Sequence, residues 1–516
     1  MGNILHKSRL LIGAVLLSQF SLVAAQENST SEELFADKCG ACHGMNRAGY
    51  IGPALNSSSH GNFPVAALEA LITYGIPGTL MPRWEGRLSK EEITGIAELI
   101  INEPVPDVSW DMADIKNSLE VYVADETSLP DAPVYPVENL AALMAVMERG
   151  YYSDGENARV LFFNGQNHEI VGAIDVDKAP HILDYHPTDE RWAYLKTDGG
   201  RLYKLDLYSM QATRSIRAGF TGPSIAVSYD GKYVATGSFV PYTVVILDAD
   251  TLEPVKYFEL KGENIEGEMV DSVSTGITAT PYGNYFAITL KHADQVWIVD
   301  LDTPDFAVTR VKNVGRDLHD SFLSRDGKQM IVASYVDDKL VAVDYEQKKV
   351  VGNVPAGCQP HVGSGAIVEV NGRDIGFGTN IGRGAGCDKT VVTAFDAQTF
   401  EVIKQIPTIG ATESPAAHPD SPYVVVDIVS GEDSAIQFID KNSLEVVKTM
   451  DIGGHAYFPE FTHDGKYIYV SAGYQGNELV IIDAETLSVV KRVPVESPAG
   501  IFGHNRPKIK TIGFKS

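Results

Sequence analysis

The sequence has little positive charge, few cysteines and no long apolar segment beyond its first residues. Lys and Arg number 42 against 68 Asp and Glu, a net charge of −26, which argues against a nucleic acid or an anionic membrane as partner. The lack of long apolar segments excludes a multi-span membrane protein, and the 44% of hydrophobic residues excludes a disordered chain. Only four of the 516 residues are cysteine. What remains is an acidic globular protein, long enough for about two to four domains.

The N-terminus has the pattern of a secretory signal peptide over residues 1–25. Lys7 and Arg9 precede an apolar run over residues 10–17, and small residues at 23–25 supply a cleavage site. We predict cleavage after Ala25 and export to the periplasm. The alternative is an uncleaved membrane anchor, but the run is shorter than the roughly 20 residues that a bilayer span needs.

Two of the four cysteines stand in one short motif, Cys39-Gly-Ala-Cys42-His43. Thiols at this spacing can bond to the two vinyl groups of a haem, while the adjacent imidazole reaches the iron as axial ligand. The alternatives are a thioredoxin-type redox pair and half of a zinc site. A redox pair does not need the histidine, and a zinc site would need two further ligands nearby. The motif therefore predicts a covalently bound c-type haem.

Three helices are expected around this motif, over residues 31–41, 64–74 and 89–101. Met81 lies in the loop between the second and the third helix, where its thioether could approach the second face of the iron. We predict Met81 as the sixth ligand; the alternative is a methionine that fills a gap in the core. A haem with His and Met ligands is closed to substrate, so this domain should carry electrons.

From residue 140 onward the chain repeats one unit, a short β-branched strand that ends in Asp or Asn and precedes a polar turn. The eight copies begin 42 to 52 residues apart and occupy residues 160–164, 202–206, 244–248, 296–300, 340–344, 392–396, 436–440 and 479–483. A four-stranded unit of this length is a propeller blade, which cannot bury both of its faces alone. We predict eight blades; a seven-bladed ring with one irregular unit is the alternative.

The predicted fold class is a small all-α class I cytochrome c domain followed by an all-β eight-bladed propeller. The cytochrome c domain is expected over residues 26–105, a linker or strap over 106–138, and the propeller over 139–516. A propeller by itself says nothing about activity, because function resides in sites placed on the fold.

Three histidines stand in the same phase of their blades, after one repeat and before the next hairpin. They are His181, His319 and His361. A single loop histidine is more often a solvated or turn-capping residue, but three in phase should meet on one face around the propeller axis. The pattern therefore favours a metal or cofactor site, with a ring of side chains contributed by different blades.

The other two cysteines, Cys358 and Cys387, lie in the propeller. In an exported protein such a pair predicts a disulfide, here closing a loop between two blades. Thiolate ligation of a second metal is the alternative.

The sequence resembles the cytochrome cd1 family, which comprises nitrite reductases and the related dihydro-haem d1 dehydrogenases. The resemblance spans nearly the whole chain after the signal peptide. In the first domain it rests on residues 67–75, Met81-Pro82 and residues 88–92, and in the propeller on the three histidines.

The resemblance implies a d1 haem or a related tetrapyrrole in the propeller, with His181 as its proximal iron ligand. It implies His319 and His361 as a distal pair that donates protons, and electron transfer to this centre through the c haem. The first function expected is reduction of nitrite to nitric oxide. The second is oxidation of dihydro-haem d1, and a third is a carrier without catalytic activity. Expected partners are a small redox protein, a cytochrome c or a cupredoxin, and a small anionic substrate or d1 precursor, in a homodimer.

The sequence departs from the reductases where these place arginines to pair the carboxylates of d1. Asp184 and Asp198 stand at two such positions, Gly222 and Pro223 at a third, and residues 362–364 replace another. We therefore expect a pocket poor in arginine, which would hold a polycarboxylate less tightly.

Other features resemble the dehydrogenases. They include the chain length, residues 360–365, residues 498–502, and His455, which lies near the position of a histidine suspected of acting on the propionate of the macrocycle. His319 instead resembles the first distal histidine of the reductases.

Overall fold

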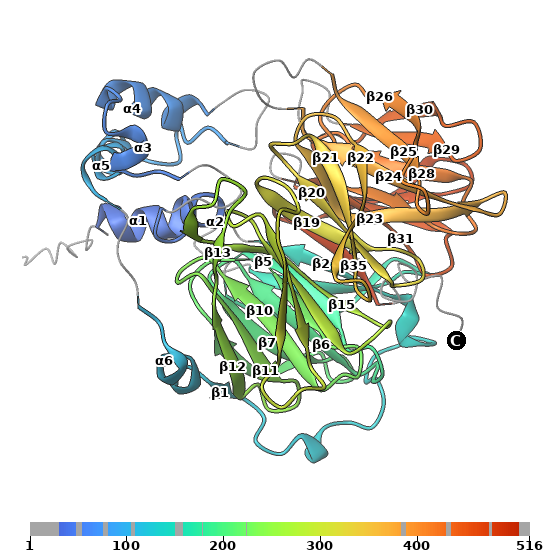
Figure 1. Ribbon diagram of the computed structural model, residues 1–516, viewed down its shortest axis with the longest axis horizontal. Coiled ribbons are helices and arrows are strands. Elements are labelled where there is room, and N and C mark those ends of the chain that lie inside the picture. The colour runs from blue at the N-terminus through green and yellow to red at the C-terminus, as the bar shows by residue number, and fades with distance from the viewer. Residues whose placement is uncertain are drawn as a thin grey trace, which may run out of the picture.

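The structure, a computed structural model, describes residues 30–47, 54–75, 81–104, 109–149, 158–177, 179–222, 224–382, 389–429, 435–473 and 477–504 (Figure 1). The predicted signal peptide and Cys387 lie outside these residues. The described chain forms a group of helices followed by a ring of β-sheets. None of the helices in the described ranges has the length and hydropathy of a membrane span.

The N-terminal part is a cluster of five helices. These are α1 (Ser31–Lys38), α2 (Gly40–His43), α3 (Ser57–His60), α4 (Val65–Tyr74) and α5 (Lys90–Asn102). Capping boxes, Thr30 with Glu33 and Ser89 with Glu92, start α1 and α5 by binding their first backbone N–H groups. The apolar faces of the helices meet in one core. The helix expected over residues 31–41 is interrupted at Cys39, which ends α1 and precedes α2.

Eight antiparallel sheets form the propeller, and we number them as blades in ring order. Blade 1 holds β5 (Pro180–Tyr185), β6 (Trp192–Thr197), β7 (Arg201–Asp206) and β8 (Gln211–Arg217); blade 2 holds β9 (Ile225–Val227), β10 (Tyr233–Ser238), β11 (Thr243–Asp248) and β12 (Pro254–Glu259). Blade 3 holds β15 (Ser274–Thr280), β16 (Tyr285–Leu290), β17 (Gln295–Asp300) and β18 (Val308–Val311); blade 4 holds β19 (Leu318–Leu323), β20 (Gln329–Ser334), β21 (Lys339–Asp344) and β22 (Lys349–Pro355).

The second half of the ring has the same architecture. Blade 5 holds β23 (Pro360–Val370), β24 (Arg373–Asn380), β25 (Val391–Asp396) and β26 (Val402–Pro407); blade 6 holds β27 (Pro415–Ala417), β28 (Tyr423–Asp427), β29 (Ala435–Asp440) and β30 (Glu445–Asp451). Blade 7 holds β31 (His455–Phe461), β32 (Tyr467–Gly473), β33 (Glu478–Asp483) and β34 (Ser488–Pro494); blade 8 holds β35 (Pro498–Gly503), β2 (Leu143–Glu148), β3 (Arg159–Asn164) and β4 (Glu169–Asp175).

The ring closes in blade 8, where β35 from the C-terminal end of the propeller pairs with β2 from its N-terminal end. The first strand of each blade contacts the first strand of the next, and β35 contacts β5. Each of the eight sequence repeats forms the third strand of one blade. The prediction of eight blades is therefore confirmed, because each repeat buries its faces against both neighbours.

Two insertions account for the longer intervals between repeats. A hairpin of β13 (Lys261–Glu263) and β14 (Met269–Asp271) lies between blades 2 and 3. In blade 5, ten residues connect β24 to β25, whereas four connect β20 to β21 in blade 4, and β23 has 11 residues. Because β24 runs back to the start of β23, both insertions lie toward the end of the ring where the first strands begin.

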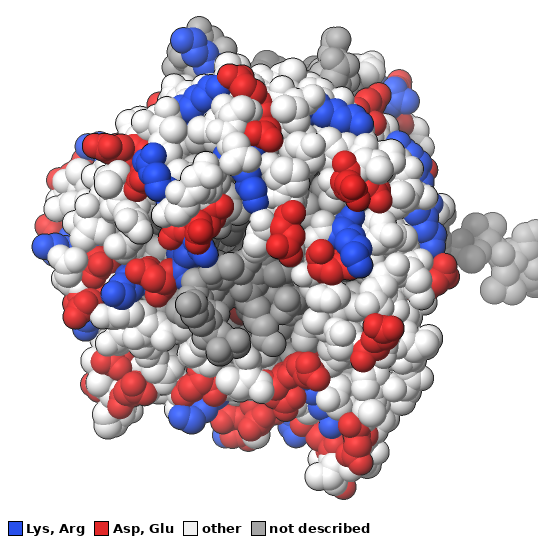
Figure 2. Space-filling model, turned by 90° about the vertical axis from the view of Figure 1, so that its right-hand side faces the viewer, with Lys and Arg blue, Asp and Glu red and all other residues white. Residues whose placement is uncertain are grey.

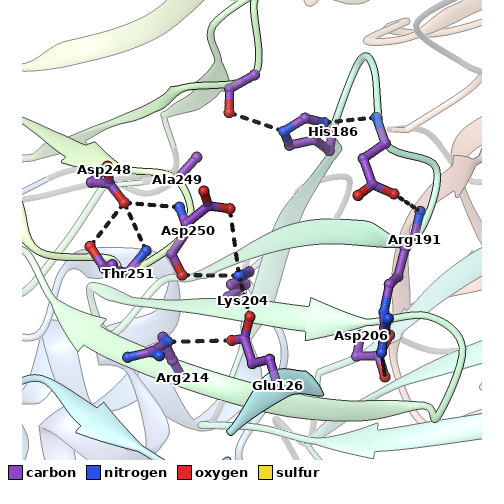
Figure 3. Close-up of polar contacts among 12 residues, drawn as sticks. Glu126, His186, Arg191, Lys204, Asp206, Arg214, Asp248, Ala249, Asp250 and Thr251 are labelled. Atoms are coloured by element: carbon purple, nitrogen blue, oxygen red, sulfur yellow. Dashed lines mark hydrogen bonds and ion pairs between the residues drawn. The ribbon is translucent and has the colours of Figure 1, made fainter. Parts of the chain in front are cut away.

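Residues 109–138 run along the propeller as a strap. They include α6 (Met112–Asn117), β1 (Glu120–Val121) and η1 (Glu126–Ser128), and η2 (Leu140–Ala142) leads into β2. Ile115 is buried in the core between blades 1 and 2, and β1 pairs with β8. Lys204 Nζ lies 2.8 Å from Glu126 Oε2, and Arg214 Nε lies 3.3 Å from Oε1 of the same carboxylate (Figure 3). The segment expected as a linker is thus fixed to blade 1.

Tight glycine turns fix neighbouring blades to one another. His186 Nε2 donates to Gly231 O at 3.0 Å, while its Nδ1 accepts from Asp189 N at 2.9 Å (Figure 3). Gly231 has φ +75°, and a Cβ there would lie 2.2 Å from the His186 ring. His418 contacts Gly465 in the same way between blades 6 and 7. These turns need glycine both for their backbone angle and for the close approach of a ring.

Acidic side chains outnumber basic ones on the surface, as the net charge of −26 requires. Figure 2 shows a face of the molecule that is hollowed at its centre, with Asp and Glu side chains gathered around much of the hollow. Lys and Arg side chains are interspersed among them rather than forming one basic patch. This face gives no support to a nucleic-acid partner.

Candidate active site

The haem-attachment motif forms the short helix α2 and the residue before it. Cys39 caps α2, and Cys42 lies three residues later, so both thiols belong to one helical turn. Neither is disulfide-bonded, and His43, the next residue, is buried. Met81 packs with Cys39 against the core of the helical part. The two thiols and the adjacent imidazole therefore fit a c-type haem, and Met81 remains the predicted sixth ligand.

The loop that carries Met81 lies close to the end of α4. Gly75 ends α4 with φ +67°, and a Cβ there would lie 2.7 Å from Met81 O and 2.8 Å from Arg83 N. Only glycine allows this approach of two backbones. The structure therefore gives a local reason why Met81 is held beside the helical core.

Cys42 also lies close to the propeller. Burial raises the pKa of its thiol to about 12, the Asp198 carboxylate of blade 1 adds to the rise, and Arg149 opposes it. Both of these residues surround His181, as described below. Asp198 and Arg149 are therefore charged neighbours both of Cys42, in the haem-attachment motif, and of His181, the predicted propeller ligand.

The three predicted histidines occupy equivalent positions in the ring. His181, His319 and His361 are each the second residue of the first strand of their blade, in β5, β19 and β23. In all three strands the register to the second strand shifts at or directly after the histidine. Such bulges redirect side chains beside functional sites. A register shift thus accompanies the histidine at the start of each of these three strands.

The ring order places these histidines on opposite sides of the axis. His181 belongs to blade 1, whereas His319 and His361 belong to blades 4 and 5. Blades 1 and 5 face each other across an eight-bladed ring, and first strands start at the same end of the propeller. The arrangement brings one imidazole to one side of the channel and two to the other.

His181 lies in a buried charged cluster. Its Nδ1 is 2.8 Å from Asp198 Oδ1 and 3.2 Å from Arg149 Nη2. Arg149 Nη1 lies 3.8 Å from Asp198 Oδ2, and Arg149 Nε donates to Ala499 O at 3.4 Å. The carboxylate therefore lies between two basic groups.

The protonation state of His181 follows from this cluster. Burial lowers its pKa, Asp198 acts in the opposite direction, and Arg149 lowers the pKa further, so the net shift is downward. Nδ1 lies between the Asp198 carboxylate at 2.8 Å and Arg149 Nη2 at 3.2 Å, and the tautomer that carries hydrogen on Nδ1, toward Asp198, leaves Nε2 for an iron ion. His181 therefore fits the predicted role of a proximal ligand.

His319 and His361 lie together on the other side. Their ring centroids are 5.0 Å apart, and the Nδ1 atoms lie 3.3 Å from Oδ1 and from Oδ2 of Asp320, respectively. His361 Nδ1 also lies 2.9 Å from the backbone oxygen of Glu413. The His319 ring stacks on Tyr335, with centroids 4.4 Å apart and planes 8° apart. One buried carboxylate thus serves two imidazoles.

The two rings have opposite pKa shifts. Burial lowers the pKa of His319 to about 4, although Asp320 acts against it. Burial also acts to lower the pKa of His361, but Asp320 and Glu413 together outweigh it and the pKa lies above its usual value. Near neutral pH, the pair therefore consists of a neutral imidazole beside one with an increased tendency to hold a second proton.

A cluster of apolar residues connects the two sides. It consists of buried Ala179, Ile381, Ala411, Val429, Tyr457 and Ala499, with Tyr335 and Phe458 packed against it. Ala179 lies two residues before His181, and Tyr335 stacks on His319. Small and aromatic side chains from several blades are the surface that a flat macrocycle would contact. The donor set and this apolar surface together fit a d1-type tetrapyrrole.

The sequence predicts a pocket poor in arginine, and on the side of His181 the structure adds one arginine that the aligned positions do not include. Asp198 faces His181 there, but Arg149 and Lys196, both fully buried, lie in the same region. Arg149 follows β2 of blade 8 and Lys196 lies in β6 of blade 1. Alignment with the arginines of the reductases could not identify Arg149. This residue reaches His181 from another blade, because ring closure places blade 8 beside blade 1.

The other positions noted for missing arginines have structural roles. Asp184 accepts hydrogen bonds from Tyr185 N and Val227 N and so connects blades 1 and 2. A Cβ at Gly222 would lie 2.9 Å from Gly237 O, and Pro223 lies outside the described residues. Val362 N donates to both oxygens of Asp320.

Asp320 is the main residue that the sequence analysis missed. It follows His319 directly, and consecutive residues of a regular strand point to opposite faces. The register shift in β19 lets both side chains take part in one cluster. The sequence shows that Asp320 follows His319, but only the register shift in β19 explains how both side chains reach one cluster.

His455 and Cys358 are the remaining predicted residues. His455 is the first residue of β31 in blade 7, is buried, and has Nδ1 3.1 Å from Val429 O. It thus begins a first strand like the other three histidines. Cys358 is disulfide-bonded, which excludes thiolate ligation of a metal, and its predicted partner Cys387 lies outside the described residues.

Comparisons with known proteins agree with both parts of the molecule. Residues 138–506 match the family "Cytochrome D1 heme domain", and residues 26–100 match "Cytochrome C oxidase, cbb3-type, subunit III". A dihydro-heme d1 dehydrogenase from Pseudomonas aeruginosa is 27% identical over 496 residues, covering 95% of this chain and 96% of the relative. A nitrite reductase from Stutzerimonas stutzeri is 25% identical over 365 residues, covering 67% and 63%.

A solved structure is similar over the same extent. It is dihydro-heme d1 dehydrogenase NirN in complex with DHE, with 27% identity and a TM-score of 0.73, covering 93% of this chain and 100% of the other. The similarity includes the helical part and the propeller together.

Proposed function

The chain belongs to the cytochrome D1 heme domain family, and from this premise we propose that it dehydrogenates a dihydro-haem d1-type macrocycle held in the propeller. The chain is a haem oxidoreductase of the cytochrome cd1 type with a c-type cytochrome domain. The similarity to a dehydrogenase over almost the full length of both chains supports this substrate, because the similarity to the nitrite reductase covers a smaller share of each.

The observation that carries the proposal is the arrangement of the three histidines. His181 faces His319 and His361 across the ring, with an apolar cluster that reaches from one side to the other. In this arrangement a flat ring with iron would lie between His181 and the distal pair, with side chains of several blades at its edges. His181 Nε2 would bind the iron, and Asp198 would fix the orientation of the imidazole.

The helical part would supply the electron acceptor. Cys39 and Cys42 would hold the c haem, with His43 and Met81 as its ligands. Dehydrogenation releases two electrons and two protons, and the c haem accepts one electron at a time. A second electron must therefore leave through a partner, for which a small redox protein such as a cytochrome c or a cupredoxin is the natural class.

Protons released from the substrate need acceptors inside the propeller. His455, which begins the first strand of blade 7, and His319, whose low pKa keeps it neutral, are suited to accept them. Tyr335 stacks on His319 and restricts its rotation. His455 is buried and the His319 side chain is only partly exposed, which limits the competition of bulk water for the proton.

A second candidate function is the reduction of nitrite, because His319 and His361 form a close distal pair. Nitrite loses one oxygen as water after it receives one electron and two protons, and a pair of imidazoles 5.0 Å apart is suited to donate them. In this case the c haem would donate the electron, so the direction of electron flow distinguishes the two reactions.

One experiment tests the proposal. The purified protein with oxidised c haem is mixed anaerobically with dihydro-haem d1, and absorption spectra follow both chromophores. We expect the macrocycle to convert while the c haem is reduced, up to one electron per chain, and full conversion only after an external oxidised cytochrome c is added. No conversion of the bound macrocycle under these conditions would contradict the proposal.

The competing function is assayed on the same preparation. Protein loaded with haem d1 and a reduced donor is supplied with nitrite, and a nitric oxide electrode records turnover. Turnover that depends on His319 and His361, together with failure of the dehydrogenase assay, would favour nitrite reduction. A signal peptide over residues 1–25 would place either reaction in the periplasm, which fractionation of cells that express the full chain tests. A homodimer is also expected, and light scattering of the purified protein tests it.

A further inference from the structure

Asp320 occupies an unusual place in the distal cluster, because its one carboxylate faces both histidines. Oδ1 lies 3.3 Å from His319 Nδ1, and Oδ2 lies 3.3 Å from His361 Nδ1. Val362 N donates to both oxygens, at 3.3 and 3.2 Å. Among the described residues, no Lys or Arg forms an ion pair with this carboxylate. The two imidazoles are therefore its main compensating groups.

The contacts define which ring nitrogens carry hydrogen. An ionised carboxylate only accepts hydrogen bonds, so each Nδ1 that faces Asp320 must carry a proton. For His361 the one Nδ1 hydrogen is donated to the backbone oxygen of Glu413 at 2.9 Å, and Asp320 Oδ2, at 3.3 Å, is its ion-pair partner. The Nε2 atoms of His319 and His361 make no hydrogen bond with other described residues. Both Nε2 atoms are thus left to meet a bound molecule.

We propose that Asp320 is a positioning residue, which holds both imidazoles by Nδ1 so that His319 presents a proton acceptor and His361 a proton donor at Nε2. The inference deepens the proposed function, on which its catalytic consequence rests. A site with one acceptor and one donor side by side can take a proton from the substrate and give another to it or to a bound oxyanion.

The surroundings of the pair support the unequal assignment. Lys291 lies on the ring of Tyr335, which in turn stacks on His319, so a positive charge opposes protonation of this imidazole. Glu413 and Asp427 lie on the side of His361 and favour its cationic form. Burial lowers the pKa of His319 to about 4, whereas the pKa of His361 is raised.

A shared metal ion is the competing interpretation, because one His319 nitrogen, one Asp320 oxygen and one His361 nitrogen lie within 4.8 Å of one another. A ligating Nδ1 cannot carry hydrogen, but His361 Nδ1 faces the Glu413 oxygen, which only accepts. The hydrogen-bonded cluster therefore explains all of the Nδ1 contacts, and a metal ion bound through Nδ1 would have to displace at least one of them.

The test measures the two histidines directly. Full-length protein with reduced c haem is labelled with ¹³C and ¹⁵N in histidine, and NMR signals are assigned with His319→Gln and His361→Gln. We expect the neutral His319 to carry hydrogen on Nδ1, a rare tautomer in water, and to titrate below pH 5. We expect His361 to titrate above pH 6.5. An Nε2–H tautomer of His319, or a His361 neutral at pH 6, would overturn the proposal.

Variants of the carboxylate complete the test. Asp320→Asn should lower the midpoint of His361 by at least one pH unit, and Asp320→Glu should restore most of the change. Asp326→Asn, in the turn at the other end of the same blade, is the matched control and should leave both midpoints unchanged. Unchanged midpoints in a folded Asp320→Asn protein, or one divalent metal per chain lost in that variant, would contradict the inference. No macrocycle is present, so this result is independent of the dehydrogenase assay.

Discussion

The two sides of the propeller channel use the same local construction. On each side a histidine stands at the second position of a bulged first strand, with Nδ1 facing a buried aspartate. His181 faces Asp198 at 2.8 Å, and His319 faces Asp320 at 3.3 Å. The sides differ in which groups compensate the negative charge of the carboxylate. Asp198 has Arg149 beside it, whereas Asp320 is shared between two imidazoles.

This difference decides where a proton is held. Arg149 carries a permanent charge, so it compensates Asp198 and His181 can stay neutral, as an iron ligand must. Asp320 has no Lys or Arg as ion-pair partner among the described residues, and its charge raises the pKa of His361 and so favours the cationic imidazole there. The first arrangement thus suits the predicted iron ligand, and the second suits the proposed proton-transfer pair.

The largest effect is expected from removing the ligand itself. His181→Ala should abolish stable binding of a d1-type macrocycle, because the only predicted iron ligand in the propeller is lost. Absorption titration with the macrocycle measures this, while the c-haem spectrum reports that the helical part is intact. His186→Ala, which removes a histidine of the same blade that contacts a turn, serves as control and should still bind. Equal affinity of wild type and His181→Ala would contradict the role of His181.

A large loss of stability is expected when the positive charge that compensates Asp198, on the side of His181, is removed. Arg149→Met leaves Asp198 buried without its permanent counter-charge, and breaking a buried pair costs about 3–5 kcal/mol. The double variant Arg149→Met/Asp198→Asn should recover much of this loss. Arg201→Met, whose partners Glu120 and Asp177 are exposed, should cost less than about 1 kcal/mol. Urea denaturation of the propeller measures all three, and equal losses for Arg149→Met and Arg201→Met would contradict the comparison.

The propeller could be predicted because its eight repeats can be recognised in the sequence. Each blade ends its third strand with the same short pattern, and eight such patterns require eight sheets. The phase of His181, His319 and His361 was also visible, since each precedes the same hairpin of its blade. The helical part could be predicted from Cys39 and Cys42 alone.

The charged partners of these histidines could not be predicted in the same way. Arg149 reaches His181 only because blade 8 is closed by β35 and lies next to blade 1. Asp320 reaches the same side as His319 because of a register shift in β19, which no alternation of polar and apolar residues reveals. Sequence patterns report the regular geometry of blades, whereas the site depends on their irregularities.

Opposite pH dependence is expected for the two histidines of the distal pair. The folded pKa of His319 is about 4, below its ordinary 6.5, so the unfolded chain binds more protons between these values and stability is lost as pH falls. His319→Gln should reduce the loss of unfolding free energy at acid pH by up to about 3 kcal/mol. The ring edge is partly exposed, so this figure is an upper bound.

His361 should show the reverse behaviour. Its folded pKa is raised, so its contribution to stability is present below pH 6.5 and is lost as pH rises through the folded value. His361→Gln should therefore flatten the stability curve on the alkaline side. Urea midpoints from pH 4.5 to 9 measure both variants. Flattening of the curve in the same pH range by both substitutions would show that the rings do not differ in protonation.

The smallest effect concerns the lysine that opposes protonation of His319. Lys291 Nζ lies 4.7 Å from the centre of the Tyr335 ring and 3.0 Å from Asp317 Oδ1, so its charge is partly compensated. Lys291→Met should raise the pKa of His319 by less than one unit and cost about 0.5–1 kcal/mol of stability. Histidine NMR measures the shift in the reduced protein. A fall in the pKa of His319 would contradict the electrostatic account, because removing a nearby positive charge can only favour the imidazolium.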